Sequence, residues 1–286
     1  MQTAEIKDEL FLQAVEAIDS GNVALLEEVL NKNPRLIRER LDYPVDGYFK
    51  DPYLLWFVAD NPVRHEKLPA NIGEITKLLI RFARQHAAES FMDQIGYALG
   101  LVVTGRIPRE CGVQIELMDM LIDAGAKAGD GHGALAHGNT DAAKHLLKRG
   151  GALTLTTAIC LGRMDDVQRL LKTASSKDIE IAFMASAFYG KTDMLKLLIA
   201  SGVNVNAYLD ASSGFHHHAS ALHQAVFSGS LAAVKMLVDA GADLTATDRI
   251  YHGTPLDWAQ HLQEGTNELD KSKYVEIEAF LAGGTL

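Results

Sequence analysis

Apolar residues recur along this chain in short stripes that match one face of a helix. In Val167, Leu170 and Leu171, for example, they fall three and four positions apart. This spacing predicts amphipathic helices that bury one side. A second set of short apolar segments, each ending at or near a glycine, predicts a preceding helix; these segments are residues 98–105, 158–162, 182–190 and 221–229. The pattern therefore predicts pairs of helices joined by tight turns.

The unit of one glycine followed by an apolar stripe returns along most of the chain. It occurs at residues 21–30, 73–80, 112–126, 138–152, 162–172, 190–207 and 229–248. We place each leading glycine in a turn, where a positive φ is cheap only for glycine. One helix pair cannot bury its apolar face alone, so neighbouring pairs must stack. The sequence predicts a single all-α solenoid over residues 1–286, with about seven to eight helix pairs.

Two segments near the C-terminus carry the residues of a known family. Ser220-Ala-Leu-His-Gln-Ala225 and Gly253-Thr-Pro-Leu-Asp-Trp-Ala259 resemble the T-P-L-H-x-A signature of ankyrin repeats, in which Ser or Thr caps a helix and Pro fits its first turn. Residues 202–206 and 241–246 resemble the stretch that closes such a repeat. The resemblance covers nearly the whole chain and is best over residues 190–262. It implies an ankyrin-like solenoid with a few short β-hairpin fingers.

Three segments depart from that pattern. Residues 41–71 are an atypical insertion between early repeats, with a helix expected to begin near Pro52. Trp56 and Phe57 are expected in the core, whereas Tyr43, Tyr48 and Phe49 could either plug the groove or grip a partner. Residues 207–219 lengthen one finger. Residues 263–286 are expected to form a C-terminal cap with a last helix over residues 274–281.

Composition and charge narrow the functional classes. The formal net charge is −10 and the isoelectric point is about 5.5. This balance disfavours nucleic-acid binding and adhesion to an anionic membrane. The two cysteines lack metal-ligand spacing, which favours a reducing compartment. We see neither a signal-peptide pattern nor a membrane-spanning run. The expectation is a soluble, cytoplasmic monomer that binds neither nucleic acid nor membrane.

No motif in the sequence supports catalysis or a cofactor. Gly190-Lys191-Thr192 lacks both the upstream glycine and the strand of a phosphate-binding loop, and Gly131-His-Gly133 does not follow a strand either. Metalloprotease, nucleophile-elbow and C-x-x-C motifs are absent from the sequence. Cys160 lies in an apolar helix, where a small buried side chain is the simplest interpretation. We therefore expect a chain that is not an enzyme and needs no cofactor.

The histidines need separate interpretations. His223 occupies the signature histidine position, and the resemblance implies a hydrogen bond between adjacent turns. His216, His217 and His218 lie in the long finger, and alternation along an arm would place His216 and His218 on one face. This pair could bind a metal ion, contact a partner, or belong to a solvated loop. A complete metal-ligand set is not apparent in the sequence, and the prediction is that no metal is bound.

The resemblance also implies where a partner would bind. In ankyrin-like stacks the fingers and the ends of the first helices line a concave groove. Clustered aromatic residues at such positions are typical of partner sites, although the same rings could instead lie in the core. The predicted partner-binding residues are His137, Leu161, Phe188, Tyr189, Tyr208, Phe215, Phe227, Ser228, Arg249, Tyr251 and His261.

The sequence thus predicts a non-catalytic protein–protein interaction module. The partner would have a basic surface, because the chain is acidic. Binding could mask or inhibit the partner, in a regulatory role or as an immunity or antitoxin-like protein. Two alternatives belong to other classes: a ligand or metal sensor that uses the histidine-bearing finger, and an enzyme with a site in the groove.

Overall fold

The computed structural model describes residues 5–264 and 268–283, which form helices and connecting loops without any β-strand. This confirms the all-α fold class. The chain divides into two compact units: unit 1 is Met1–Ala134 with Asp141–Gly151, and unit 2 is Leu135–Thr140 with Ala152–Leu286. One uninterrupted solenoid over residues 1–286 stays a prediction. Within the described residues, we find no helix of the length and apolar character needed to cross a membrane.

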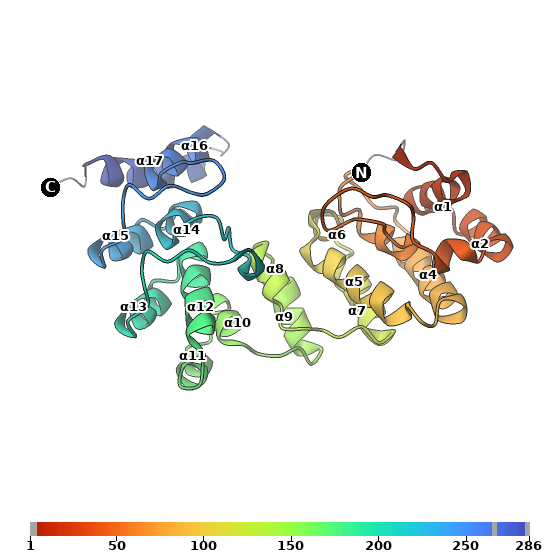
Figure 1. Cartoon of the computed structure of the whole chain (residues 1–286), viewed down its shortest axis with the longest axis horizontal. Helices are drawn as coiled ribbons and strands as arrows, with labels where there is room; N and C mark the ends of the chain where they lie inside the picture. The colour runs from red at the N-terminus through yellow and green to blue at the C-terminus, as the bar shows by residue number, and fades with distance from the viewer. Residues whose placement is uncertain (1–4, 265–267, 284–286) are drawn as a thin grey trace. The chain divides into compact units, whose positions relative to one another are not determined.

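Unit 2 is a stack of helix pairs in two layers (Figure 1). Its first helices are α10 (Leu155–Cys160), α12 (Ser176–Phe188), α14 (Ala221–Ser228) and α16 (Pro255–Glu264). Its second helices are α11 (Met164–Leu171), α13 (Thr192–Ala200), α15 (Leu231–Asp239) and α17 (Glu268–Gly283). Each first helix packs on the first helix of the next pair and on its own second helix. This is the stacking that the repeated glycine unit predicts.

Glycines form the turns between the two helices of a pair. Gly162, Gly190 and Gly229 have φ values of +70°, +58° and +71° and follow α10, α12 and α14. A side chain at such a φ would be strained, so glycine is the residue that closes these turns at least cost. The prediction of turn glycines is confirmed at these three positions.

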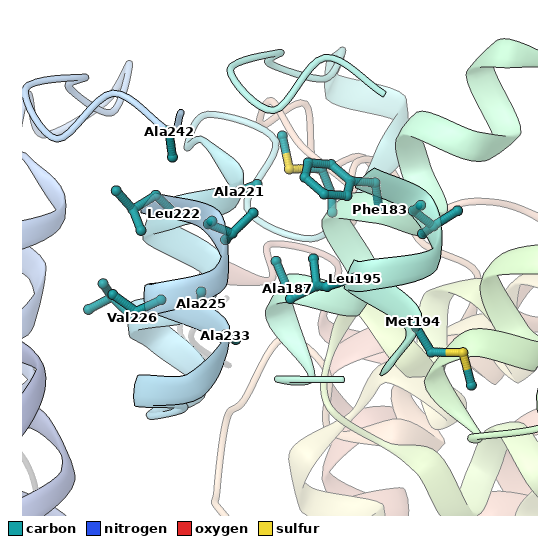
Figure 2. Packing of buried hydrophobic residues seen from close by; sticks show 14 of the residues in the cluster. Phe183, Ala187, Met194, Leu195, Ala221, Leu222, Ala225, Val226, Ala233 and Ala242 are labelled. Carbon is teal, nitrogen blue, oxygen red and sulfur yellow. The ribbon is translucent and has the colours of Figure 1, made fainter. Parts of the chain in front are cut away.

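The core of unit 2 fills the space between the two layers. Phe183 and Ala187 of α12, Leu195 of α13, and Leu222 and Val226 of α14 are all buried (Figure 2). The small alanines of the first helices let successive helices approach closely, while the larger residues fill the layer between them. The predicted last helix also packs here, because Tyr274, Ile277 and Leu281 of α17 are buried. Residues 265–267 and 284–286 of the predicted C-terminal cap lie outside the described residues.

Unit 1 is also built from packed helices, but a 3-10 helix takes the place of one first helix. Its elements are α1 (Glu9–Asp19), α2 (Val23–Lys32), α3 (Arg35–Arg38), the 3-10 helix η2 (Leu54–Ala59), α4 (Ile72–His86), α5 (Phe91–Thr104), α6 (Arg106–Glu110) and α7 (Gln114–Asp123). The chain continues through α8 (His132–Ala136) and α9 (Thr140–Lys148). The η2 helix packs against α1, α4 and α5, in the place of a first helix. The predicted core positions of Trp56 and Phe57 are confirmed, at 4% and 0% exposed.

The rest of the 41–71 insertion is held by a buried ionic contact. The Arg64 guanidinium is 1% exposed and lies 2.8 Å from Asp19 Oδ1 and 3.6 Å from Asp60 Oδ1. Phe49 is buried beside the aromatic core, so it neither plugs a groove nor reaches a partner. Tyr48 remains 57% exposed. The Tyr43 hydroxyl donates to Glu5 Oε2 at 2.9 Å, which ties the insertion to the start of the described chain.

Two expectations about local structure are corrected. Gly73 is not a turn glycine: it lies inside the first turn of α4, where an added Cβ would stand 2.5 Å from Glu116 Oε1 of α7. It lies against the side chains of Glu116 and Met120 of α7, and the turn before α4 is made by other residues. The β-hairpin arms expected in the fingers are also not found in the described residues. Residues 207–219 instead form turns around the short 3-10 helix η3 (Ala211–Ser213).

Candidate functional site

The loop between α15 and α16 is organised by one buried carboxylate. Asp248 Oδ1 accepts hydrogen bonds from the backbone N–H groups of Ile250 (2.9 Å) and Tyr251 (2.7 Å). Its Oδ2 accepts from the Gly253 N–H (3.0 Å) and from Trp258 Nε1 (3.1 Å). Burial raises the pKa of Asp248, but the four hydrogen bonds outweigh it and lower this pKa to about 2. An ionised carboxylate therefore fixes both the loop and the Trp258 indole.

The signature histidine joins two neighbouring repeats. The Ser220 N–H donates to His223 Nδ1 (3.3 Å), so Nε2 carries the proton and donates to the Gly253 carbonyl at 3.0 Å. Burial lowers the pKa of His223, which keeps the imidazole neutral in this arrangement. The structural role implied by the family resemblance is confirmed. The bond also anchors the Asp248 loop to α14.

Three phenylalanines form a layered cluster at the ends of α12 and α14. The Phe227 ring stacks on Phe188, with ring centres 5.2 Å apart and planes 25° apart. Phe215, from the long finger, packs edge-on against Phe188 from 5.4 Å. Phe215 is 1% and Phe188 is 9% exposed, whereas Phe227 is 36% exposed. Phe227 is thus the outermost ring of the cluster, and the other two hold it in place.

An open pocket lies beside Phe227, entirely within unit 2. Its volume is about 590 Å³, and its aromatic and imidazole lining comes from His216, His218, Phe227, Tyr251, Trp258 and His261. The His216 ring centre lies 4.6 Å from that of Phe227, and the His218 ring centre lies 5.9 Å from that of Trp258. Tyr251 at the rim is 77% exposed. We call this site the aromatic pocket.

The walls of the aromatic pocket carry little positive charge at neutral pH. Burial is the main cause that lowers the pKa of His216 and of His218, so both imidazoles are neutral at pH 7. The lining includes one carboxylate, that of Asp257. Among the described residues that line the pocket there is neither a lysine nor an arginine. The pocket is thus apolar with one anionic group.

Three of the predicted partner-binding residues line the aromatic pocket, and the others do not. Phe227, Tyr251 and His261 line the aromatic pocket. Phe215 is too buried to contact a partner, and Phe188 supports the pocket from below; both are corrections to the predicted surface. The sequence placed them at a finger and a helix end, but their rings turn inward to pack on each other.

The remaining predicted residues lie outside the pocket lining. The Tyr189 hydroxyl donates to the Leu135 carbonyl at 2.7 Å, and burial raises the pKa of Tyr189 well above its usual range. Ser228 Oγ donates to the Ala225 carbonyl at 2.7 Å. Arg249 lies 4.4 Å above the Tyr208 ring on the neighbouring fingers. His137 is exposed and Leu161 is half-buried.

Sequence reasoning missed Trp258 and Asp257 as site residues. Both lie in the Thr-Pro-Leu-Asp-Trp segment, which was interpreted only as a helix start. That helix start is confirmed: the Thr254 N–H donates to Asp257 Oδ2 at 2.7 Å, and the Asp257 N–H donates back to Thr254 Oγ1 at 3.2 Å. The sequence did contain one signal for this site: Trp258 is a large aromatic residue near the start of a helix, in the repeat that follows the long finger.

The pocket does not assemble the usual groups for metal or nucleophilic chemistry. Across the described ranges, no three His, Cys, Asp or Glu side chains are grouped so that they could hold a metal ion. Asp248, a carboxylate close to the pocket, already accepts four hydrogen bonds. Cys160 is buried, and burial raises the pKa of its thiol to about 12, which makes a thiolate nucleophile unfavourable.

Comparison with protein families agrees with the stacked helix pairs. The family model of ankyrin repeats, in three copies, matches residues 111–248. This segment of the chain is similar to ankyrin repeats. Ankyrin repeats are generally protein–protein interaction modules and are typically non-catalytic. A search of curated proteins finds no match for this chain. The matched ankyrin range ends at Asp248, so Tyr251, Trp258 and His261 of the aromatic pocket follow it.

Proposed function

We propose that this chain binds a partner protein through the aromatic pocket of unit 2, with Phe227 and Tyr251 as the main contacts. The observation that carries this proposal is that the exposed rings of Phe227 and Tyr251 are held in place by buried groups. Phe227 is stacked on the buried Phe188, and the Tyr251 backbone is held by Asp248. Aromatic side chains held in this way supply contact area at low entropic cost and are common among binding hot spots.

The arrangement supports a binding role better than a catalytic one. The three groups beside the pocket that would be obvious candidates for chemistry, Asp248, His223 and Asp257, each make a hydrogen bond that fixes a loop or a helix end. An exposed aromatic patch costs solubility unless a partner covers it. We further propose that the chain acts by masking the partner surface that it covers, which suits an inhibitory or regulatory role in the cytoplasm. In this proposal a single chain acts as a monomer, and unit 2 supplies the contact.

A double substitution tests this proposal. Phe227→Ala/Tyr251→Ala should weaken partner binding about 30-fold or more, since a hot-spot side chain contributes about 2 kcal/mol or more. The measurement is the dissociation constant of the partner that the wild-type chain retains from source-cell lysate, determined by titration calorimetry with the purified pair. Circular dichroism should show an unchanged fold, because both side chains lie at the surface.

The control uses apolar residues of similar exposure elsewhere. Ile115 on α7 and Val275 on α17 are 38% and 45% exposed and lie outside the aromatic pocket. Ile115→Ala/Val275→Ala should leave the dissociation constant unchanged within twofold. If this control weakened binding as much as the pocket variant, or if the pocket variant bound like wild type, the aromatic pocket would not be the docking site.

A further inference from the structure

We propose that the aromatic pocket receives an arginine side chain of the partner. This inference rests on the proposed function and specifies the chemistry of the group that the pocket recognises. The pocket combines rings with one carboxylate, and its described lining residues include neither lysine nor arginine. Burial disfavours the charged form of two of its three histidines, His216 and His218. An aromatic wall beside an anion is complementary to a cation that also has apolar surface. The chain as a whole carries a net charge of −10, which adds to this complementarity.

Asp257 is the anionic group of the site. Its Oδ2 is held by the Thr254 N–H and hydroxyl, both at 2.7 Å, so the carboxylate has a fixed orientation. The hydrogen bond from the Thr254 side chain is the main cause that lowers the pKa of Asp257, and the group is ionised at pH 7. Its Oδ1 accepts no hydrogen bond from the described residues, and Asp257 as a whole is exposed. One carboxylate oxygen is therefore available to a ligand.

Trp258 is the ring best suited to attract a cation. Its indole N–H donates to Asp248 Oδ2 at 3.1 Å, and Asp248 is ionised because its pKa is about 2. A hydrogen bond to an anion draws the indole proton toward that anion and leaves more electron density on the ring. Cations are attracted to the ring face by this density, and tryptophan is the strongest of the aromatic side chains in this respect. Asp248 thus acts on a ligand through Trp258, without touching it.

Arginine fits the pocket better than lysine. The guanidinium is planar, is more weakly hydrated than an ammonium group, and can stack on a ring while it donates to a carboxylate. The pocket is wide, at about 590 Å³, with rings on several sides, and a flat cation covers more of that surface than a compact ammonium group does. A lysine would have to give up its tightly bound water for contacts that replace that water poorly.

The test uses small probes and the indole N–H signals of the protein. The chain has two tryptophans, Trp56 in unit 1 and Trp258 in the pocket, so two side-chain indole signals are expected in a ¹⁵N-resolved spectrum. N-acetyl-arginine amide should shift the Trp258 signal in a saturable way and leave the Trp56 signal in place. N-acetyl-citrulline amide, which has the same shape without the charge, and N-acetyl-lysine amide should both bind at least threefold more weakly.

A conservative variant checks the role of the carboxylate. Asp257→Asn keeps an oxygen for the Thr254 cap but removes the charge, so the fold should persist and arginine-probe affinity should fall about threefold or more. Equal shifts by the arginine and citrulline probes, stronger binding of the lysine probe, or no saturable shift of Trp258 would each overturn the arginine assignment. These outcomes are distinct from failure of the proposed function, which is judged from partner binding by Phe227→Ala/Tyr251→Ala and needs no probe.

Discussion

Replacing Asp248 by alanine should lower the free energy of unfolding by about 3 kcal/mol, because it leaves four donors around a buried site without their acceptor. The loop that carries Tyr251 and the indole of Trp258 would both lose their anchor. Urea denaturation followed by circular dichroism measures this change. Asp243 provides the matched control, since it is an exposed aspartate in the preceding turn that accepts from the Thr245 hydroxyl and backbone N–H. Asp243→Ala should cost less than about 1 kcal/mol.

The same carboxylate predicts a specific response to acid. The pKa of Asp248 is lowered from 3.8 to about 2 in the folded chain, so the unfolded chain binds a proton more readily. The stabilisation is complete above about pH 5 and is lost as the pH falls toward 2, by about 2 kcal/mol in all. In Asp248→Ala this part of the acid dependence should be missing. An unfolding free energy that falls equally steeply in wild type and variant over this range would show that Asp248 is not stabilised as described.

Arg64→Met should destabilise unit 1 by about 3–5 kcal/mol, because it removes the cation from a buried ionic cluster. Arg64 and Asp60 are each 1% exposed in this cluster, and Asp19 lies 2.8 Å from the guanidinium. Two carboxylates would then stay close together without their counter-ion. The change is measured by urea denaturation monitored through the fluorescence of Trp56, which lies in the same insertion.

A surface arginine in unit 1 gives the comparison for Arg64. Arg106 is 48% exposed and pairs with Glu110 at 2.8 Å and with Glu66 at 3.6 Å. Arg106→Met should cost less than about 1 kcal/mol, since solvent screens exposed pairs. Similar losses for the two variants would mean that burial of the Arg64 cluster contributes nothing beyond an ordinary surface pair.

The helix pairs could be predicted from the sequence because they depend on local patterns. The apolar stripe of α11 or α13 and the turn glycines Gly162 and Gly190 act within a few residues of each other. Gly73 shows the limit of this approach. A glycine can permit a positive φ or permit a close neighbour, and only the packing of α4 on α7 shows that Gly73 does the second.

The candidate site was only partly predictable, because contacts between segments far apart in the sequence decide which of its side chains are buried and which are exposed. Phe188 and Phe227 hold the same place at the ends of α12 and α14, yet one is 9% and the other 36% exposed. Phe188 is covered by Phe215 and His216 of the long finger as well as by Phe227 itself. The Arg64–Asp19 contact likewise joins residues that are 45 positions apart. No periodicity in the sequence reports such contacts. Asp248 did leave a signal, since an aspartate before a tight loop often bonds the backbone ahead of it.

Site-specific photo-crosslinking tests the central claim most directly. A benzoylphenylalanine would be placed at position 251 on the rim of the aromatic pocket, at position 227 on the pocket wall, and at position 115 on α7 as the control. Positions 251 and 227 are expected to crosslink in source cells to one and the same protein, whereas position 115 is not. Crosslinks to that protein from position 115 but from neither pocket position would contradict the assignment of the aromatic pocket as the docking site.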